Sequence, residues 1–145
     1  MKYICQVTIN RSLNEVAALW ENESYFHKWQ DEFSYIELKA GLKNTKGAIS
    51  KIVFDGDRKI ILKETILNYN MPHEKIGLYE HTHMINTQRS TFKAVGENKT
   101  LYKSEVEYTK FNGLFMKVIA KLFPGKFKQQ SQKWMDQFKA FAESQ

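Results

Sequence analysis

The sequence predicts an α+β fold in which a curved, seven-stranded antiparallel sheet packs against a long C-terminal helix. The first observation is that most of residues 31–111 shows the two-residue alternation of strands. The second is that apolar residues after Gly113 recur at multiples of a helical turn and mark one face of a long helix. This apolar stripe consists of Met116, Ala120, Phe123, Phe127, Trp134, Phe138 and Phe141, with Ser131 in its one gap. Hairpin-connected strands leave one sheet face in need of a cover, and only this helix is large enough.

The chain begins with a predicted strand and two short helices. Residues 2–10 alternate, with Tyr3, Cys5, Val7 and Ile9 on one face, as in a half-buried strand. Ser12 and Glu15 have the spacing of a capping box, which predicts that a helix starts there. Asn22 is a typical N-cap for a second, shorter helix over residues 23–29.

Six further strands are predicted before the terminal helix. They cover residues 33–39, 48–54, 59–69, 76–82, 85–95 and 100–110. Asp55-Gly56 is a strong hairpin signal, and Pro72 marks a break because proline is disfavoured in a strand ladder.

Pro124-Gly125 interrupts the predicted terminal helix. Proline removes a backbone donor and clashes with the preceding turn, yet the apolar stripe keeps its phase across the interruption. Two arrangements fit this pattern, one kinked helix or two helices nearly in line. We favour the kinked helix.

Length and composition predict one domain over residues 1–145. A hydrophobic content of 42%, of which one third is aromatic, excludes a disordered chain. Cys5 is the only cysteine, so a disulfide framework and a cysteine-based zinc cluster are excluded, and we expect a small buried side chain. The polar residues of the first strand do not fit a signal peptide, and no segment is apolar enough for a membrane span, so we expect a cytoplasmic protein.

The net charge of +6 is partly concentrated near the C-terminus. After residue 109 only Asp136 and Glu143 oppose seven lysines, at positions 110, 117, 121, 126, 128, 133 and 139. A solvated helix face is the first interpretation, and weak contact with an anionic membrane is the second. No nucleic-acid-binding motif is present, so we expect no nucleic-acid partner. The sequence does not indicate the oligomeric state.

One strand has two different faces, and the cavity side must be chosen between them. Met84, Asn86, Gln88, Ser90 and Phe92 form one face, and Ile85, Thr87, Arg89, Thr91 and Val95 form the other. We favour the first face as the inner one, because it buries Phe92 and avoids burying an unpaired Arg89.

Two further pairs of side chains have spacings that suit chemistry. His81 and His83 lie on one strand face, but no convincing third and fourth ligands accompany them, so we predict no metal site. Glu105 and Glu107 also share a face, and we expect this face to be solvated and paired with Lys103 or Arg89.

Four segments carry a resemblance to a known family: VTINRSLNEVAALW, KETILNYNMP, STFKAVGENKTLYKSEVEY and PGKFKQQSQKWMDQFKAFAE. Together they resemble the START-like, or SRPBCC, superfamily with its helix-grip fold, in particular its small bacterial members. The superfamily includes birch-pollen-allergen-like proteins, lipid-transfer START domains and polyketide cyclase/dehydrase-like proteins. The resemblance covers nearly the whole chain and implies a cavity between sheet and closing helix for an apolar or amphipathic ligand.

We therefore expect non-catalytic binding or transport of a hydrophobic small molecule, such as a lipid or a polyketide-like aromatic, without a cofactor or catalytic residue. The expected ligand-binding residues are Trp29, Phe54, Met84, Gln88, Phe92, Tyr108, Phe127, Ser131, Trp134, Met135 and Phe138. One alternative is a cyclase- or hydrolase-type enzyme that uses Tyr108, Glu105 or His81 as acid or base. Another is an interaction protein that docks through the lysine-rich closing helix.

Overall fold

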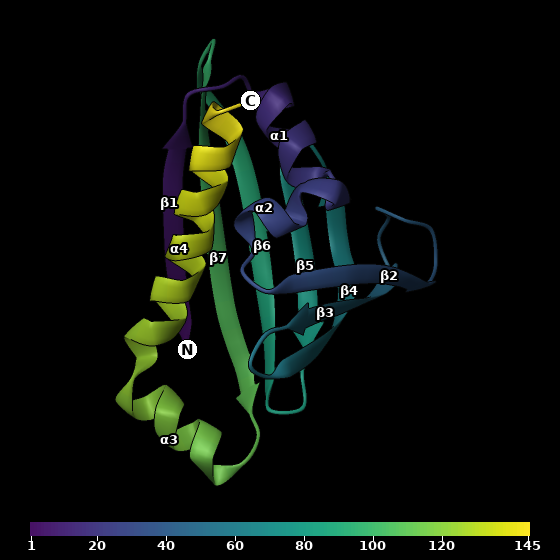
Figure 1. Cartoon of the computed structure of the whole chain (residues 1–145), viewed down its shortest axis with the longest axis vertical. Coiled ribbons are helices and arrows are strands. Elements are labelled where there is room, and N and C mark those ends of the chain that lie inside the picture. The colour runs from purple at the N-terminus through teal and green to yellow at the C-terminus, as the bar shows by residue number, and fades with distance from the viewer.

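The computed structural model describes all 145 residues, and Figure 1 shows their arrangement. Seven strands form one antiparallel sheet in the order β1-β7-β6-β5-β4-β3-β2. Their bounds are β1 (Lys2–Ile9), β2 (Phe33–Ala40), β3 (Ile49–Asp55), β4 (Lys59–Asn70), β5 (Glu74–Glu80), β6 (Met84–Gly96) and β7 (Lys99–Phe111). The predicted fold class is confirmed, and each strand boundary lies within two residues of its predicted place.

The helices are α1 (Leu13–Glu21), the 3₁₀ turn η1 (Glu23–Tyr25), α2 (Phe26–Trp29), α3 (Leu114–Leu122) and α4 (Pro124–Glu143). Ser12 caps α1 and Asn22 caps η1 through their side-chain oxygens, as predicted. The sheet bends strongly, so that β2 and β3 run across the direction of β5 and β6, while α4 runs along β1 and α2 lies between α4 and β2 (Figure 1). None of the helices combines the length and apolar character needed to cross a membrane.

The terminal helix differs from the kinked helix that the sequence favoured. Phe123, with φ −131° and ψ 52°, separates α3 from α4, and Pro124 is the first residue of α4. Proline suits a first helical position because its φ is already helical and the missing N–H is not needed there. The two helices meet at a steep angle (Figure 1). The apolar stripe of α3 is therefore not continued by that of α4.

Side chains of α4 hold it along β1, the edge strand of the sheet. Gln132 Nε2 donates to the carbonyl of Gln6 at 3.2 Å, and Lys139 Nζ donates to that of Thr8 at 2.7 Å. The two hydrogen bonds join successive positions of α4 to successive positions of β1, which fixes where α4 lies along the sheet.

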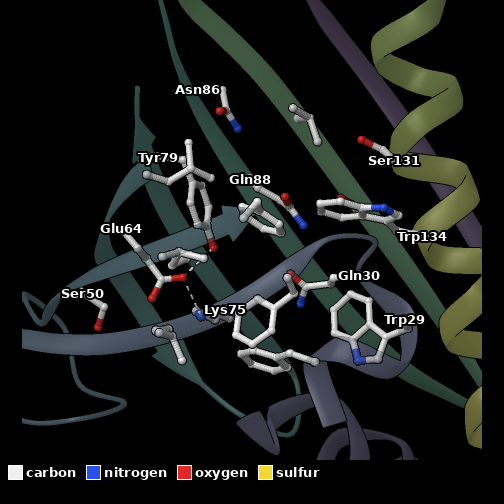
Figure 2. Close-up of a pocket in the computed structure, with 18 of the residues that line it drawn as sticks. Trp29, Gln30, Ser50, Glu64, Lys75, Tyr79, Asn86, Gln88, Ser131 and Trp134 are labelled. Atoms are coloured by element: carbon white, nitrogen blue, oxygen red, sulfur yellow. Dashed lines mark hydrogen bonds and ion pairs between the residues drawn. The ribbon is translucent and has the colours of Figure 1, made fainter. Parts of the chain in front are cut away.

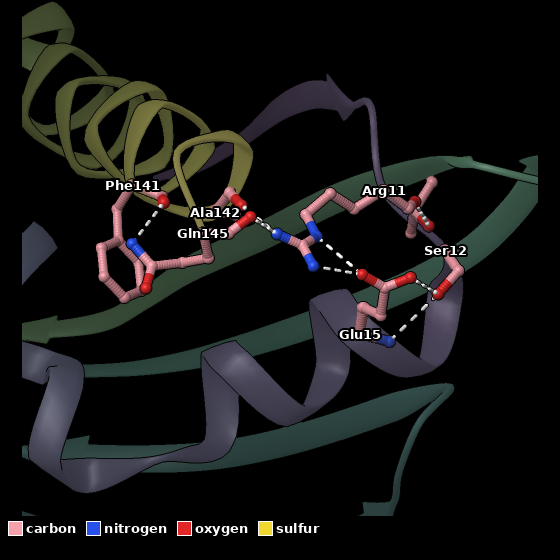
Figure 3. A network of polar contacts seen from close by, with 7 residues as sticks. Arg11, Ser12, Glu15, Phe141, Ala142 and Gln145 are labelled. Atoms are coloured by element: carbon pink, nitrogen blue, oxygen red, sulfur yellow. Dashed lines mark hydrogen bonds and ion pairs between the residues drawn. The ribbon is translucent and has the colours of Figure 1, made fainter.

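Arg11 closes the end of this layer (Figure 3). Its guanidinium pairs with Glu15, with Nε to Oε2 at 2.8 Å, and also donates to the carbonyls of Ala142 and Gln145. A cation at a helix C-terminus satisfies free carbonyls and complements the helix dipole. The start of α1 and the end of α4 are thereby tied together.

The hydrophobic core lies under α1, α2 and the second half of α4. Ten buried residues form it: Cys5, Ile9, Val16, Trp20, Trp29, Phe92, Tyr102, Met135, Phe138 and Ala142. Cys5 is the small buried side chain that we expected, and burial raises the pKa of its thiol. Burial also raises the pKa of Tyr102 to about 12, so this phenol is neutral at physiological pH.

Candidate functional site

A cavity of about 870 Å³ lies between the bent sheet, α2 and the first half of α4. Its wall has 39 residues, of which 22 are hydrophobic, and Figure 2 shows part of it. A cavity of this size, mostly apolar and with a few polar groups, is typical of small-molecule sites.

Aromatic side chains from both layers form much of the wall. Trp134 of α4 stacks on Phe54 of β3, with ring centroids 5.5 Å apart. Phe127 of α4 packs against Tyr108 of β7 at 5.1 Å. Trp29 of α2 completes this side, and the indole Nε1 atoms of Trp29 and Trp134 are buried without a hydrogen-bond partner.

A cluster of polar side chains lies opposite the aromatic wall, on β4 and β5 (Figure 2). Glu64 is directly across from Tyr79 in the strand register. Its Oε2 accepts hydrogen bonds from Tyr79 Oη at 2.8 Å and from Lys75 Nζ at 3.0 Å. Both bonds go to Oε2, so Oε1 is free to accept a hydrogen bond from a guest molecule.

The ion pair in this cluster is shielded from solvent. The side chains of Glu64 and Lys75 are 5% and 15% exposed, so each charge depends on its partner. Burial, together with the neighbouring carboxylate of Glu64, raises the pKa of Tyr79 well above its ordinary value. Tyr79 is therefore a neutral hydrogen-bond donor at physiological pH.

Gly77 shapes the cluster by lacking a side chain. A Cβ at Gly77 would lie 2.7 Å from the hydroxyl oxygen of Tyr79 and equally close to its ring. Such a contact does not occur between real atoms, so the ring occupies the space that a side chain at position 77 would need. Glycine thus lets Tyr79 lie flat on the strand and reach Glu64.

Other polar groups are spread around the cavity. Asn86 and Gln88 of β6 lie between the sheet and α4 (Figure 2). Tyr3 and Ser131 share a hydrogen bond of 2.7 Å, and burial raises the pKa of Tyr3. Tyr69 donates to Glu21, and burial raises the pKa of this phenol too.

The charge of the cavity wall is opposite to that of the whole chain. Five carboxylates line it, those of Glu21, Glu23, Asp31, Glu32 and Glu64. Three lysines accompany them, Lys43, Lys75 and Lys133. The wall is therefore acidic by two charges, although the net charge of the chain is +6.

Comparison with known proteins finds the same architecture in solved structures. The Zhui aromatase/cyclase from a Streptomyces species superposes with a TM-score of 0.81 at 6% identity, over 99% of this chain and 93% of that one. Ara h 8.0201 gives 0.76 at 11% identity, over 100% and 99%. A START superfamily protein from Mycobacterium smegmatis gives 0.71 at 11% identity, over 92% and 93%. The chain has the START-like helix-grip fold.

The sequence itself matches no protein-family profile and no curated protein. At identities of 6–11% the likeness establishes the START-like fold and leaves the ligand open.

Most of the residues expected to bind a ligand line the cavity of this START-like fold. They are Trp29, Phe54, Met84, Gln88, Tyr108, Phe127, Ser131, Trp134 and Met135. The favoured face of β6 is the inner one, since Met84, Asn86 and Gln88 line the cavity. Arg89 is half exposed on the outer face and pairs with Glu74 and Glu105.

Phe92 and Phe138 were also expected to line the cavity, but the structure places both in the packed core and not in the cavity wall. Trp20 of α1 lies against Phe92 at 5.1 Å, and Trp29 lies against Phe138 at 5.3 Å. Trp20 and Trp29 thus fill the space next to these two phenylalanine rings, where the cavity would otherwise extend.

Two of the three acid–base candidates line the cavity. Burial raises the pKa of Tyr108 and lowers that of His81, so both are neutral at physiological pH. Glu105 lies on the outer face, where the Arg89 guanidinium holds the pKa of its carboxyl low. His81 and His83 lie close together, and no group of three or more candidate ligands surrounds a metal position.

The Glu64–Lys75–Tyr79 cluster was not predicted from the sequence. Ile60, Leu62, Glu64 and Ile66 all face the cavity, so a strict two-residue alternation would have placed Glu64 inside. This alternation was hard to recognise because Ile61 and Leu67, which are exposed on the outer face of β4, are also apolar. Apolar residues therefore occur on both faces of the strand.

Proposed function

We propose that the chain binds a neutral amphipathic molecule with an apolar body and a hydroxyl group, and releases it unchanged. The observation that carries the proposal is the Glu64–Lys75–Tyr79 cluster, which lies inside a cavity whose wall is mostly hydrophobic. The apolar body occupies the space beside Trp134, Phe54 and Phe127, where burial contributes roughly 25 cal/mol per Å² removed from water.

The chemistry of the cluster favours a hydroxyl over a carboxylate. The free Oε1 of Glu64 needs a donor, which a hydroxyl supplies and a carboxylate lacks. Lys75 is already neutralised by Glu64, and the rest of the cavity wall is acidic, so an anionic group meets repulsion. A lipid alcohol, a sterol or a phenolic polyketide has the required groups.

A matched pair of ligands tests this proposal. 1-Dodecanol and laurate share one alkyl chain and differ in the polar end, and the flavonoid naringenin adds an aromatic body with phenols. We expect dodecanol and naringenin to raise the thermal midpoint of the protein, because a ligand that binds only the folded state stabilises it. We expect laurate to have a much smaller effect. No shift with any of the three, or a preference for laurate, would contradict the proposal.

Two variants connect the preference to the cluster. Glu64→Gln removes the negative charge of the cluster. It should therefore reduce the difference between the thermal-midpoint shift caused by dodecanol and the shift caused by laurate. Glu105→Gln changes a carboxylate on the outer face and should leave the difference unchanged. Native mass spectrometry of freshly purified protein would in addition reveal a ligand carried from the cell.

A cyclase activity is the second candidate function. It is favoured by the ionisable cluster inside the cavity and by the fold likeness to the Zhui aromatase/cyclase. In such a reaction an enol carbon of a linear poly-β-ketone forms a C–C bond with a carbonyl carbon of the same chain, and one water leaves. Mass spectrometry of that substrate after incubation would show the loss of water, and Lys75→Met should abolish it. An unchanged mass favours binding alone.

A further inference from the structure

Helix α3 exposes an unusual amount of apolar surface. Leu114, Phe115 and Leu122 are 81%, 73% and 62% exposed, and Val118 is 42% exposed. At 100° per residue these four side chains span about 100° of the helix circumference, so they form one continuous strip. We call these four residues the α3 strip. Apolar strips of this kind are typical of interaction surfaces.

The rest of α3 is arranged around this strip. Met116, Ile119 and Ala120, on the opposite side, are half buried. Lys117 and Lys121 lie one helical turn apart, directly beside the strip, and are exposed. Apolar side chains with flanking lysines are the pattern of helices that lie in the plane of a membrane interface, with the ammonium groups reaching the headgroups.

The charge around α3 is of one sign only. Residues 108–135 contain six lysines and no aspartate or glutamate. Of these, Lys133 is paired with Asp31, whereas Lys110, Lys117, Lys121, Lys126 and Lys128 form no ion pair within the chain. Unpaired positive charge beside exposed apolar side chains is complementary to an anionic lipid surface.

We propose that α3 docks the protein on an anionic bilayer, with the α3 strip inserted among the acyl chains and the lysines on the phosphate groups. A second copy of the chain fits this surface less well. A twofold contact through α3 would bring Lys117 and Lys121 close to their own copies without any acidic residue to offset the repulsion.

The position of α3 gives the docking a direction. It lies at the end of the molecule opposite the C-terminus (Figure 1). The residues that flank it, Phe111 and Phe127, both pack on Tyr108, with centroids 5.3 and 5.1 Å away. Tyr108 and Phe127 line the cavity, so docking brings this end of the cavity to the bilayer.

Vesicle flotation tests the proposal. The protein should float with vesicles of equal parts phosphatidylcholine and phosphatidylglycerol, and only weakly with phosphatidylcholine alone. Phe115→Ser combined with Leu122→Ser should weaken partition by at least about tenfold, because each side chain buries a large apolar area. Lys117→Gln combined with Lys121→Gln should weaken partition by about tenfold at low ionic strength and by less at high salt.

Matched controls lie on the far hairpin between β6 and β7. Val95→Ser removes an exposed apolar side chain far from α3, and Lys93→Gln with Lys99→Gln removes two unpaired exposed lysines. Neither should change partition. All the changed residues are exposed, so circular dichroism and the thermal midpoint should be unchanged by every variant.

A dye attached at a Phe115→Cys variant gives a second measurement, since Cys5 is buried and does not compete. Its fluorescence should shift to the blue on anionic vesicles. An absent shift, or equal loss of binding in the control variants, overturns the proposal. So does light scattering that shows a dimer of the free protein which the Phe115 and Leu122 substitutions dissociate.

Discussion

The two halves of α4 face different surroundings although they belong to one helix. The C-terminal part, with Phe138 and Ala142, is fully packed against the core under α1 and α2. The first half, with Phe127, Ser131 and Trp134, borders the cavity. The difference comes from what lies opposite, since Trp20 and Trp29 fill the space at one end and no bulky element does so at the other. The length of α4 that borders the cavity is therefore determined by how far α1 and α2 extend over the sheet.

The largest difference is expected between two phenylalanines of α4. Phe138→Ala should lower the free energy of unfolding by about 3–5 kcal/mol, because it leaves a hole in close packing. Phe127→Ala should cost roughly 1 kcal/mol, because the side chain already borders empty space. Urea denaturation measures both values, and equal losses would contradict the division of α4.

The buried ion pair gives the next largest effect. Lys75→Met should destabilise the protein by about 2 kcal/mol, because it leaves the Glu64 carboxylate buried without its cation. Adding Glu64→Gln in the same chain should recover part of the loss. A double-mutant cycle by thermal or urea unfolding checks this, and additive losses would show that the pair is not coupled.

Filling the cavity should separate binding from stability. Ser131→Leu places a larger side chain at the gap in the aromatic wall, so it should abolish the thermal shift with dodecanol. The free energy of unfolding should fall by only about 1–2 kcal/mol, because the hydrogen bond between Ser131 and Tyr3 is lost. Gln129→Leu makes the same kind of change on the exposed side of α4 and should leave the shift intact. Undiminished binding in Ser131→Leu would place the ligand elsewhere.

The smallest effect concerns the contact between α4 and the segment before β2. The hydrogen bond and ion pair with Lys133, at 2.9 Å, lower the pKa of the Asp31 carboxyl. A carboxyl with a lowered pKa in the folded state adds stability that is present above the unfolded pKa and is lost as pH falls through the folded one. Stability should therefore decline below about pH 4, by less than about 1 kcal/mol because the pair is well exposed. Asp31→Asn should remove this part of the acid dependence in unfolding curves.

The sheet could be predicted from the sequence because each strand carries its own alternation and each turn its own residues. The direction of a side chain on β6 could be predicted for the same reason, and Arg89 faces outward as its charge requires. The packing of Trp20 on Phe92 could not be predicted. Alternation indicates which face of a strand a residue lies on, but it does not indicate which part of that face α1 covers.

Helix α3 shows a second limit of pattern analysis. The apolar stripe keeps its phase across Pro124, although Phe123 leaves the helical conformation and turns the chain. Periodicity gives the relative rotation of residues within a helix and carries no information on the angle between two helices. The Glu64–Lys75–Tyr79 cluster was not predicted because β4 carries apolar residues on both faces, so alternation did not identify which face lies inside.

The contacts between α4 and β1 also affect how the protein behaves among its own copies. An edge strand with free carbonyls is a template on which another chain can add a strand and start aggregation. Gln132 and Lys139 occupy the carbonyls of Gln6 and Thr8, so that border of the sheet is closed to such growth. The opposite border, β2, has two register irregularities, which disturb the regular ladder that an incoming strand needs. The sheet is therefore protected from edge-to-edge polymerisation at both ends by different means.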